Sequence, residues 1–555
     1  MAAVGSTFVS FSKAGASLAE AAPHSASGFA NDEILRQPDA AIAYGGIESP
    51  IPLSRQGSEW TGKGVLVTLG REEAGEGWTL RLASPTTAVS HVHLRWNLQI
   101  PSDVRCIGDA WERSYGDLEW RGIVPERVMP WYFLAFDGHT VRGYGVKTQP
   151  AAFCFWQLDA EGVSLWADVR NGGMPLQLGQ RQLEVATVVS RKSEANESPF
   201  AAAQVFCRAM CAKPRLPGHA LFGSNDWYYA YGHNTADGIL RDADLMAQVA
   251  PAGGARPFVV IDDGWQDPKR FPSMTDLAAR IASRSVRPGL WIRPLRAPSG
   301  ADSSLLLPDA RFGQQAQHAS LAWDPTIPEA LEQVLASIRQ PMAWGYEFIK
   351  HDFSTFDMLG RWGFAMGALP AEGTWQFADR TRTTAEIVAG LYRSLREAAG
   401  DKATILGCNT VGHLSAGLFE SQRIGDDASG TAWERTRRMG VNALGLRLPQ
   451  HRTFFWADPD CVALTPQIDW THTRQWLDVV ARSGVSLFVS PDTQAVGPEQ
   501  RAALQEAFAR VGSSSGSAED WLDTTSPQQW RFDAESRQSV RYDWSGPAGA
   551  IPFPI

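Results

Sequence analysis

The sequence predicts a multidomain α/β and β protein in three parts: an N-terminal β-sandwich in residues 1–215, a (β/α)8 barrel in residues 216–495, and a C-terminal helix with a small β-sheet in residues 496–555. Two observations predict this fold class. The chain of 555 residues exceeds the usual size of one hydrophobic core. Its hydrophobic pattern also changes twice, from short β-rich segments to strands alternating with amphipathic helices, and back to β-rich segments.

The N-terminal part contains short apolar segments rich in β-branched and aromatic residues. Examples are Gly64-Val-Leu-Val-Thr-Leu, Val92-His-Leu-Arg-Trp and Val163-Ser-Leu-Trp-Ala-Asp-Val. Because no helical period separates such segments, they indicate a β-sandwich. A helix is expected next, at residues 199–211, before the pattern of the barrel begins.

Strand-like segments alternate with amphipathic stretches in the central part. This alternation predicts a (β/α)8 barrel, in which each of eight parallel strands is followed by a helix. A doubly wound open sheet is the alternative, but neither a Gly-x-Gly-x-x-Gly sequence nor a phosphate-binding loop follows any strand. The predicted strands are residues 221–225, 258–263, 288–293, 348–352, 403–409, 421–427, 453–458 and 485–490. The predicted helices include residues 235–249, 276–285, 328–338, 384–398, 432–443, 473–482 and 498–511.

Composition and charge narrow the class of partner. The formal net charge of -9 is spread along the chain, which argues against nucleic acid and anionic membranes as partners. No apolar run is long enough to predict a membrane span. Residues 1–33 lack the features of a signal peptide, and the six scattered cysteines are expected to be reduced core thiols. We therefore expect a cytoplasmic protein with a small, neutral ligand.

The sequence Phe348-Ile-Lys-His-Asp-Phe is an apolar strand that ends in a cation and a carboxylate. Alternate side chains of a strand point to the same side, so Lys350 and Asp352 are expected to project together. A neighbouring cation keeps a carboxylate ionised, as a carboxylate nucleophile requires. A lone Lys-x-Asp pair is more often a structural ion pair, so the other strand ends decide between these interpretations.

The other predicted strands also end in polar or aromatic residues. The C-terminal ends of barrel strands meet at one face, where active sites of this fold lie, so the sequence predicts a pocket lined by carboxylates, tryptophans and cations. The 22 tryptophans fit such a pocket, because indole rings stack on the apolar faces of sugars. The strand-end residues selected as candidates are Trp227, Asp262, Asp263, Trp265, Trp291, Arg293, Lys350, Asp352, Cys408, Asn409, Arg423, Asp426 and Asp427.

Four of these strand-end motifs, in this order, resemble the α-galactosidase clan and most of all glycoside hydrolase family 36, which is close to the raffinose synthases. They are Val260-Ile-Asp-Asp-Gly-Trp, Ile349-Lys-His-Asp, Gly407-Cys-Asn and Arg423-x-x-x-Asp427. The N-terminal Ala110-Trp-Glu-Arg-Ser-Tyr-Gly and Met129-Pro-Trp-Tyr resemble the β-supersandwich domain of that family. The resemblance covers about residues 50–495.

The resemblance implies a role for each matching residue. Asp352 is the expected nucleophile, and Lys350, Asp262 and Asp263 are expected to bind the sugar hydroxyls. The remaining candidates that were expected to contact the substrate are Trp227, Trp265, Trp291, Arg293, Cys408, Asn409 and Arg423. The acid/base is expected to be Asp427, which lies four residues after Arg423, and Asp426 is the alternative.

The expected function is therefore a retaining glycoside hydrolase that cleaves terminal α-galactosides through two carboxylates. An α-galactosyl transglycosidase and an α-N-acetylgalactosaminidase are the alternatives, and a non-catalytic sugar-binding protein is a further one. No metal or organic cofactor is expected, and the expected partner is a small carbohydrate. The sequence leaves the oligomeric state open, including a homo-oligomer.

Overall fold

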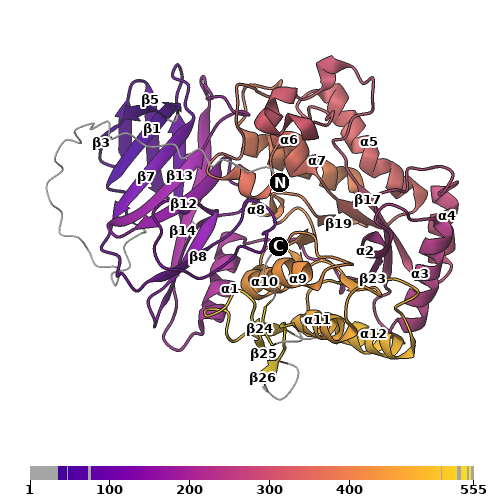
Figure 1. Ribbon diagram of the computed structural model, residues 1–555. Coiled ribbons are helices and arrows are strands. Elements are labelled where there is room, and N and C mark those ends of the chain that lie inside the picture. The colour runs from indigo at the N-terminus through magenta and orange to yellow at the C-terminus, as the bar shows by residue number, and fades with distance from the viewer. Residues whose placement is uncertain are drawn as a thin grey trace.

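The computed structural model describes residues 36–46, 48–72, 77–513, 515–533, 539–546 and 549–551. Two antiparallel sheets form one side of the molecule, a ring of parallel strands and helices forms the other, and a small sheet lies beside the last helices (Figure 1). The predicted fold class is therefore confirmed. The interpretation of residues 1–33 lies outside the described residues, and the boundaries near residues 215 and 495 stay predictions.

The two N-terminal sheets share one hydrophobic core. Successive side chains of a strand alternate between its faces, and β5 accordingly buries Val65, Val67 and Leu69 while the residues between them are half-buried. The six-stranded sheet has the order β2 (Ser49–Pro52), β1 (Ala40–Gly46), β7 (His91–Asn97), β13 (Gly162–Asp168), β12 (Phe153–Asp159) and β9 (Met129–Pro130). The eight-stranded sheet has the order β3 (Ser54–Gln56), β4 (Glu59–Gly62), β5 (Val65–Arg71), β6 (Trp78–Ala83), β14 (Gln182–Lys192), β11 (Val141–Val146), β10 (Tyr132–Phe136) and β8 (Arg105–Gly108).

Helix α1 (Pro199–Met210) confirms the helix predicted at residues 199–211. It follows β14 and packs on β11. The Ser198 side chain caps its first turn. The helix lies very close to the sheet at Gly143, where a Cβ atom would come within 2.4 Å of the Phe206 ring. The absence of a side chain at this position therefore sets the distance between helix and sheet.

The two edge strands of the parallel sheet follow one another directly in the chain. All eight predicted barrel segments contain a strand. The sheet order is β21 (Trp456–Asp458), β20 (Ser421–Arg423), β19 (Thr404–Gly407), β18 (Phe348–His351), β17 (Arg287–Ile292), β16 (Phe258–Ile261), β15 (Phe222–Asn225), β23 (Leu487–Pro491) and β22 (Val462–Leu464).

The seventh position of the barrel holds two short strands instead of one. β21 pairs with β20, β22 pairs with β23, and residues 459–461 connect the two. At this break Asp460 has a φ of 78°, which is unusual for a residue other than glycine. The connection joins the two edges of the sheet and closes the ring. β21 lies within the predicted strand 453–458, whereas β22 lies outside every predicted strand.

Helices surround the barrel, and two of them differ from the prediction. Helix α5 continues through Pro341 to Trp344, where Gly345 with a φ of 98° ends it and Tyr346 N donates to the Pro341 carbonyl. The predicted helix 432–443 is α9 (Trp433–Thr436), a π-helix (Arg437–Val441) and α10 (Asn442–Arg447). The other helices are α2 (Trp227–Ala230), α3 (Ala236–Val249), α4 (Met274–Ala282), α5 (Pro328–Trp344), α6 (Ser354–Leu359), α7 (Thr384–Ala399), α8 (Gly412–Ser415) and α11 (Trp470–Ser483), with 3-10 turns at Ser303–Leu305, Asp309–His318, Gly363–Met366 and Leu448–Gln450.

The C-terminal part is a helix and a three-stranded sheet, as predicted. Helix α12 (Pro498–Arg510) packs on α11 and α3. β24 (Gly516–Ala518), β25 (Gln529–Phe532) and β26 (Ser539–Arg541) form an antiparallel sheet, and β24 contacts α11. All six cysteines are buried and unpaired, as expected of core thiols. Among the described residues, none of the helices has the length and apolar character of a membrane span.

A segment of the N-terminal part reaches the C-terminal face of the barrel. After β8 the chain passes over the end of β20, where Ser114 N donates to the Ile424 carbonyl and Asp426 N donates to the Ser114 carbonyl. Arg447 and Asp109 form an ion pair of 2.9 Å between the same two parts. The sandwich and the barrel are therefore joined next to the face on which the candidate residues lie.

Replacing Arg447 by alanine will destabilise the protein strongly. The side chains of Arg447 and Asp109 are 3% and 4% exposed, and burial raises the pKa of Asp109 although Arg447 opposes the rise. Removing one partner of a buried pair leaves the other charge uncompensated, at a cost of about 3–5 kcal/mol. Urea unfolding of both proteins measures the change. Arg339→Ala breaks an exposed pair with Glu332 and should leave the transition in place; equal effects would contradict the prediction.

Candidate active site

Lys350 and Asp262 form the base of the candidate site, inside the barrel. The Lys350 ammonium donates to Asp262 Oδ2 at 2.7 Å, and Asn225 Nδ2 donates to the same oxygen at 2.8 Å. Burial alone would lower the pKa of Lys350, but Asp262 and other neighbouring acidic groups together hold that pKa well above the ordinary value. Lys350 is therefore a fixed cation.

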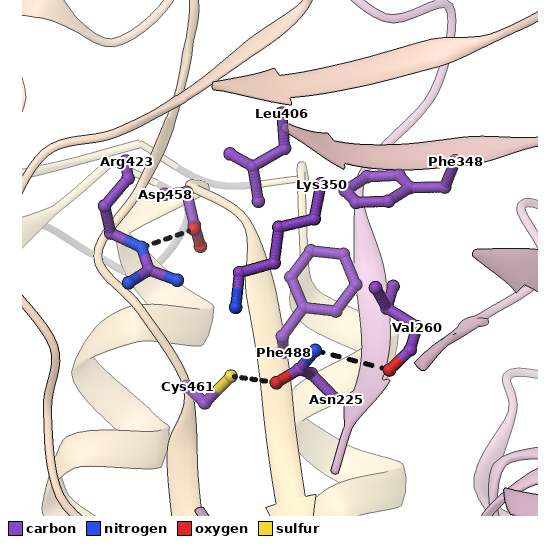
Figure 2. A pocket seen from close by; sticks show the side chains of 9 residues that line it. All are labelled: Asn225, Val260, Phe348, Lys350, Leu406, Arg423, Asp458, Cys461 and Phe488. Carbon is purple, nitrogen blue, oxygen red and sulfur yellow. Dashed lines mark hydrogen bonds and ion pairs between the residues drawn. The ribbon is translucent and has the colours of Figure 1, made fainter. Parts of the chain in front are cut away.

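A cavity of about 10 Å³ adjoins this cation. In Figure 2 the Lys350 side chain extends into it between Arg423 and Asn225. This volume approaches what one water molecule requires, and Asp458 Oδ1 at its wall accepts no hydrogen bond from the described residues. The residues that line the cavity are Asn225, Val260, Phe348, Lys350, Leu406, Arg423, Asp458, Cys461 and Phe488.

Asp352 lies directly after β18, and three N–H groups hold its carboxylate. The Trp291 indole donates to Oδ2 at 3.0 Å, while the backbone N–H groups of Phe353 and Asn409 donate to Oδ1 at 2.7 and 3.1 Å. Trp291 is the register partner of Lys350, so β17 and β18 present both residues on one face. Neutral donors therefore orient Asp352, and no cation of the described residues forms an ion pair with it.

Asp226 lies behind Asp262 and gives the site a second layer of carboxylates. It precedes α2, but its side chain does not cap that helix. Its oxygens accept from Asp262 N at 2.7 Å and from Asn234 Nδ2 at 2.6 Å. Burial, together with the nearby charge of Asp262, raises the pKa of Asp226 to about 7.

Arg423 is the second buried cation of the site, and its side chain is 2% exposed. Its guanidinium pairs with Asp458 at 2.9 Å, with Asp460 at 2.9 Å and with Asp427 at 3.4 Å. Asp460 also accepts hydrogen bonds from the Tyr228 hydroxyl and from Ala428 N. Asp458 and Asp460 are thus held in the wall, and neither caps a helix.

The adjacent carboxylates Asp426 and Asp427 differ in their surroundings. Asp426 is held between Arg113 and Arg435 in two ion pairs of 2.8 Å, and its side chain is 12% exposed. Asp427 is 41% exposed and contacts Arg113 at 3.0 Å. Although desolvation raises the pKa of Asp427, the guanidinium groups of Arg113 and Arg423 hold it below the ordinary value. Asp427 is the more accessible of the two and is ionised in the free protein.

Arg113 and Glu112, which come from the N-terminal segment after β8, are not among the residues predicted for the site. Arg113 contacts both Asp427 and the Cys408 thiol, the latter at 3.7 Å. The buried Glu112 accepts hydrogen bonds from the Asn409 side chain and the Tyr115 hydroxyl. The motif Ala110-Trp-Glu-Arg-Ser-Tyr-Gly contains both residues, but its resemblance indicates the N-terminal domain and gives them no role in the site.

The three candidate tryptophans occupy different parts of the site. Trp227 is half-buried beside Tyr231, with 5.7 Å between ring centroids. Trp265 donates its indole N–H to the Trp291 carbonyl at 2.9 Å and packs edge-on against Trp344. A cavity of about 560 Å³ between the barrel and α5 is lined in part by Trp265, Trp291, Trp344 and Asp263. Asp263 therefore lies at the rim, outside the Lys350 ion pair.

Arg293, Cys408 and Asn409 surround Asp352 in different ways. The Arg293 guanidinium forms an ion pair of 2.5 Å with the buried Asp357 and lies 4.3 Å from the Phe353 ring, so it fixes the segment after Asp352. Cys408 is buried, and burial raises the pKa of its thiol above the ordinary value. Asn409 contributes its backbone N–H to Asp352. Among the described residues, no group of three His, Cys, Asp or Glu side chains is arranged to hold a metal ion.

Comparison with known proteins agrees with this architecture. No protein-family model matches the sequence. An α-galactosidase from Thermus thermophilus, solved in complex with p-nitrophenyl α-D-galactopyranoside, matches with a TM-score of 0.59 at 19% identity, over 86% of this chain and 97% of that one.

Two further solved structures have similar coverage. A family 36 α-galactosidase from Geobacillus stearothermophilus in complex with 1-deoxygalactonojirimycin matches with a TM-score of 0.57 at 12% identity, over 89% of this chain and 77% of that one. An α-galactosidase from Lactobacillus brevis matches with a TM-score of 0.52 at 10% identity, over 89% and 76% of the two chains. This chain thus has the fold of the family 36 α-galactosidases, as the resemblance of its motifs predicted.

Proposed function

We propose that this protein is a retaining glycoside hydrolase that cleaves terminal α-galactosides. The observation that carries the proposal is the pair of carboxylates at the barrel mouth. Asp352 is oriented by three neutral N–H donors, and Asp427 is exposed beside two guanidinium groups. The backbone of Asn409 contacts the first carboxylate, and Arg113 contacts both the second carboxylate and the Cys408 thiol. A pair of carboxylates, one as nucleophile and one as acid/base, is what this reaction class requires.

In the first step, an Asp352 oxygen attacks the anomeric carbon. The glycosidic bond breaks, its electron pair moves to the leaving oxygen, and that oxygen takes the proton of Asp427, which enters this step in its protonated form. In the second step, water attacks the anomeric carbon from the opposite face while Asp427 accepts its proton, and the bond to Asp352 breaks. Two inversions give net retention of the α-configuration.

The buried ion pair of Lys350 and Asp262 supports recognition of a sugar. An ammonium group donates hydrogen bonds and a carboxylate accepts them, so adjacent hydroxyls of one sugar ring find both kinds of partner. Asp263 at the rim adds a further acceptor. The solved proteins with this fold include complexes with p-nitrophenyl α-D-galactopyranoside and with stachyose, which supports α-galactosides as the substrate class.

Replacing Asp352 by alanine will remove hydrolysis of p-nitrophenyl α-D-galactoside, with a loss of roughly three orders of magnitude or more. Added azide will restore turnover by attacking the face that Asp352 left free, and the product will be the β-galactosyl azide. Release of nitrophenol and the product configuration by NMR measure both effects. Asp401→Ala, at a carboxylate that is 99% exposed, is the control.

The same assay separates the proposal from its alternatives. It includes the α-glucoside, the α-N-acetylgalactosaminide and the β-galactoside, and a second sugar as acceptor. If the protein hydrolyses the α-N-acetylgalactosaminide in preference to the α-galactoside, it is an α-N-acetylgalactosaminidase. Turnover that requires the acceptor would indicate a transglycosidase, and binding without any turnover would overturn the enzymatic proposal.

Replacing Asp427 by asparagine will affect substrates according to their leaving groups. For melibiose, whose leaving sugar needs a proton, kcat/KM should fall by about 10²–10⁴-fold. For α-galactosyl fluoride the fall should be much smaller, because fluoride departs without protonation. Asp426→Asn is the matched control, and its effects on the two substrates should be equal. If Asp426→Asn shows the leaving-group dependence instead, Asp426 is the acid.

The pH dependence of kcat/KM should also differ between melibiose and α-galactosyl fluoride, because only melibiose needs the proton of Asp427. Desolvation raises the pKa of Asp427, but Arg113 and Arg423 lower it more, so the protonated form is lost as pH rises through a value below the usual carboxyl range. Hydrolysis of melibiose will therefore decline with rising pH, while hydrolysis of α-galactosyl fluoride will not follow this decline. Identical profiles for the two substrates would contradict the assignment of Asp427 as the acid.

A further inference from the structure

Phe364 is an exposed aromatic side chain beside the candidate active site. It is 72% exposed, which is far more than any other exposed large hydrophobic side chain among the described residues. It lies on the 3-10 turn Gly363–Met366, in the connection that follows Asp352 and α6. A phenyl ring held open to solvent loses the benefit of burial, so a ligand that covers it gains that benefit.

The turn that carries Phe364 is fixed to the segment that holds Asp427. Gly363 N donates to Glu112 Oε1 at 2.9 Å, and the rings of Phe364 and Tyr115 lie 5.8 Å apart. Gly363 has a φ of 52°, and a Cβ atom at this position would lie 2.9 Å from the Tyr115 ring. The glycine therefore allows the turn to pack on Tyr115 and to present Phe364 outward.

A short series of contacts leads from Phe364 to the proposed acid. Tyr115 lies against the Arg113 guanidinium, whose carbon is 5.7 Å from the ring centroid, and Arg113 contacts Asp427 at 3.0 Å. In the proposed reaction, Asp427 donates its proton to the oxygen of the leaving group. A leaving group that extends from Asp427 along this series of contacts would reach Phe364.

A polar cleft of about 430 Å³ adjoins Phe364. Its walls include the exposed Asp117 and the pair of Glu119 and Arg121, whose side chains are 40% and 46% exposed and lie 3.0 Å apart. These groups offer hydrogen-bond acceptors and donors within reach of solvent. An aromatic ring beside such a cleft matches a sugar, which has an apolar ring face and polar hydroxyls at its edge.

We propose that Phe364 and the cleft beside it bind the leaving-group sugar of an oligosaccharide α-galactoside. The phenyl ring stacks on the apolar face of this sugar, and the polar side chains of the cleft contact its hydroxyls. This inference rests on the proposed function. It concerns the leaving-group sugar beyond the glycosidic oxygen, which Asp352 and Asp427 do not contact. The natural substrate is then an oligosaccharide in which galactose is α-linked to a second sugar. A smaller leaving group would not cover Phe364.

The test compares melibiose and raffinose, which have leaving-group sugars, with α-galactosyl fluoride, which has none. Phe364→Ala should lower kcat/KM for both oligosaccharides about tenfold more than for the fluoride, which corresponds to loss of one stacking contact of about 1.4 kcal/mol. Phe364→Trp should restore the oligosaccharide values, because it keeps an aromatic face. Leu216→Ala, at another exposed hydrophobic residue, is the matched control and should change neither ratio.

Three outcomes would overturn the inference. If Phe364→Ala lowers kcat/KM for the oligosaccharides and the fluoride equally, the residue supports the fold of the turn and does not bind the leaving group. If Phe364→Ala leaves kcat/KM unchanged for all of these substrates, the leaving group lies elsewhere. If the wild-type protein does not hydrolyse α-galactosyl fluoride at all, the proposed function fails first, and the inference fails with it.

Discussion

The candidate site depends on the buried guanidinium of Arg423. A charge removed from water is costly unless opposite charges and hydrogen bonds surround it, and Arg423 meets this requirement with three carboxylates. Two of them, Asp458 and Asp460, stand on either side of Pro459 at the break between β21 and β22. The same cation therefore holds both sides of the interrupted strand and reaches Asp427 at the barrel mouth. Without it, these carboxylates would repel one another in the interior.

The N-terminal sandwich completes this arrangement of charges. Arg113 adds a second guanidinium on Asp427, and Glu112 fixes the Asn409 side chain behind Asp352. Both residues lie on a segment that is bound to the barrel by backbone hydrogen bonds at Ser114 and by the Arg447 ion pair. Without the sandwich, Asp427 would keep its 3.4 Å ion pair with Arg423 but lose the shorter contact of 3.0 Å with Arg113. The sandwich therefore contributes directly to the electrostatics of the site.

Residues close together in one strand were predictable from the sequence, and contacts between distant segments were not. Strand alternation predicts that Lys350 and Asp352 project together, and this property is local. Trp291, the register partner of Lys350, donates to Asp352. Arg113 lies 314 residues before Asp427, and no period or spacing links two such positions. Arg293 shows the same limit in another way. Its position at a strand end was visible, but its pairing with Asp357 depends on how the next helix folds back.

The cations of the site act on the state that follows the first step of the proposed reaction. As Asp352 bonds to the sugar it loses its negative charge, and as Asp427 gives up its proton it gains one. The carboxylate that loses charge is held by neutral N–H donors, whereas the one that gains charge lies between Arg113 and Arg423. Preorganised cations that face developing negative charge stabilise it without rearrangement. The low pKa of Asp427 in the free protein therefore reflects an arrangement that favours the covalent intermediate, in which Asp427 is the base that activates water.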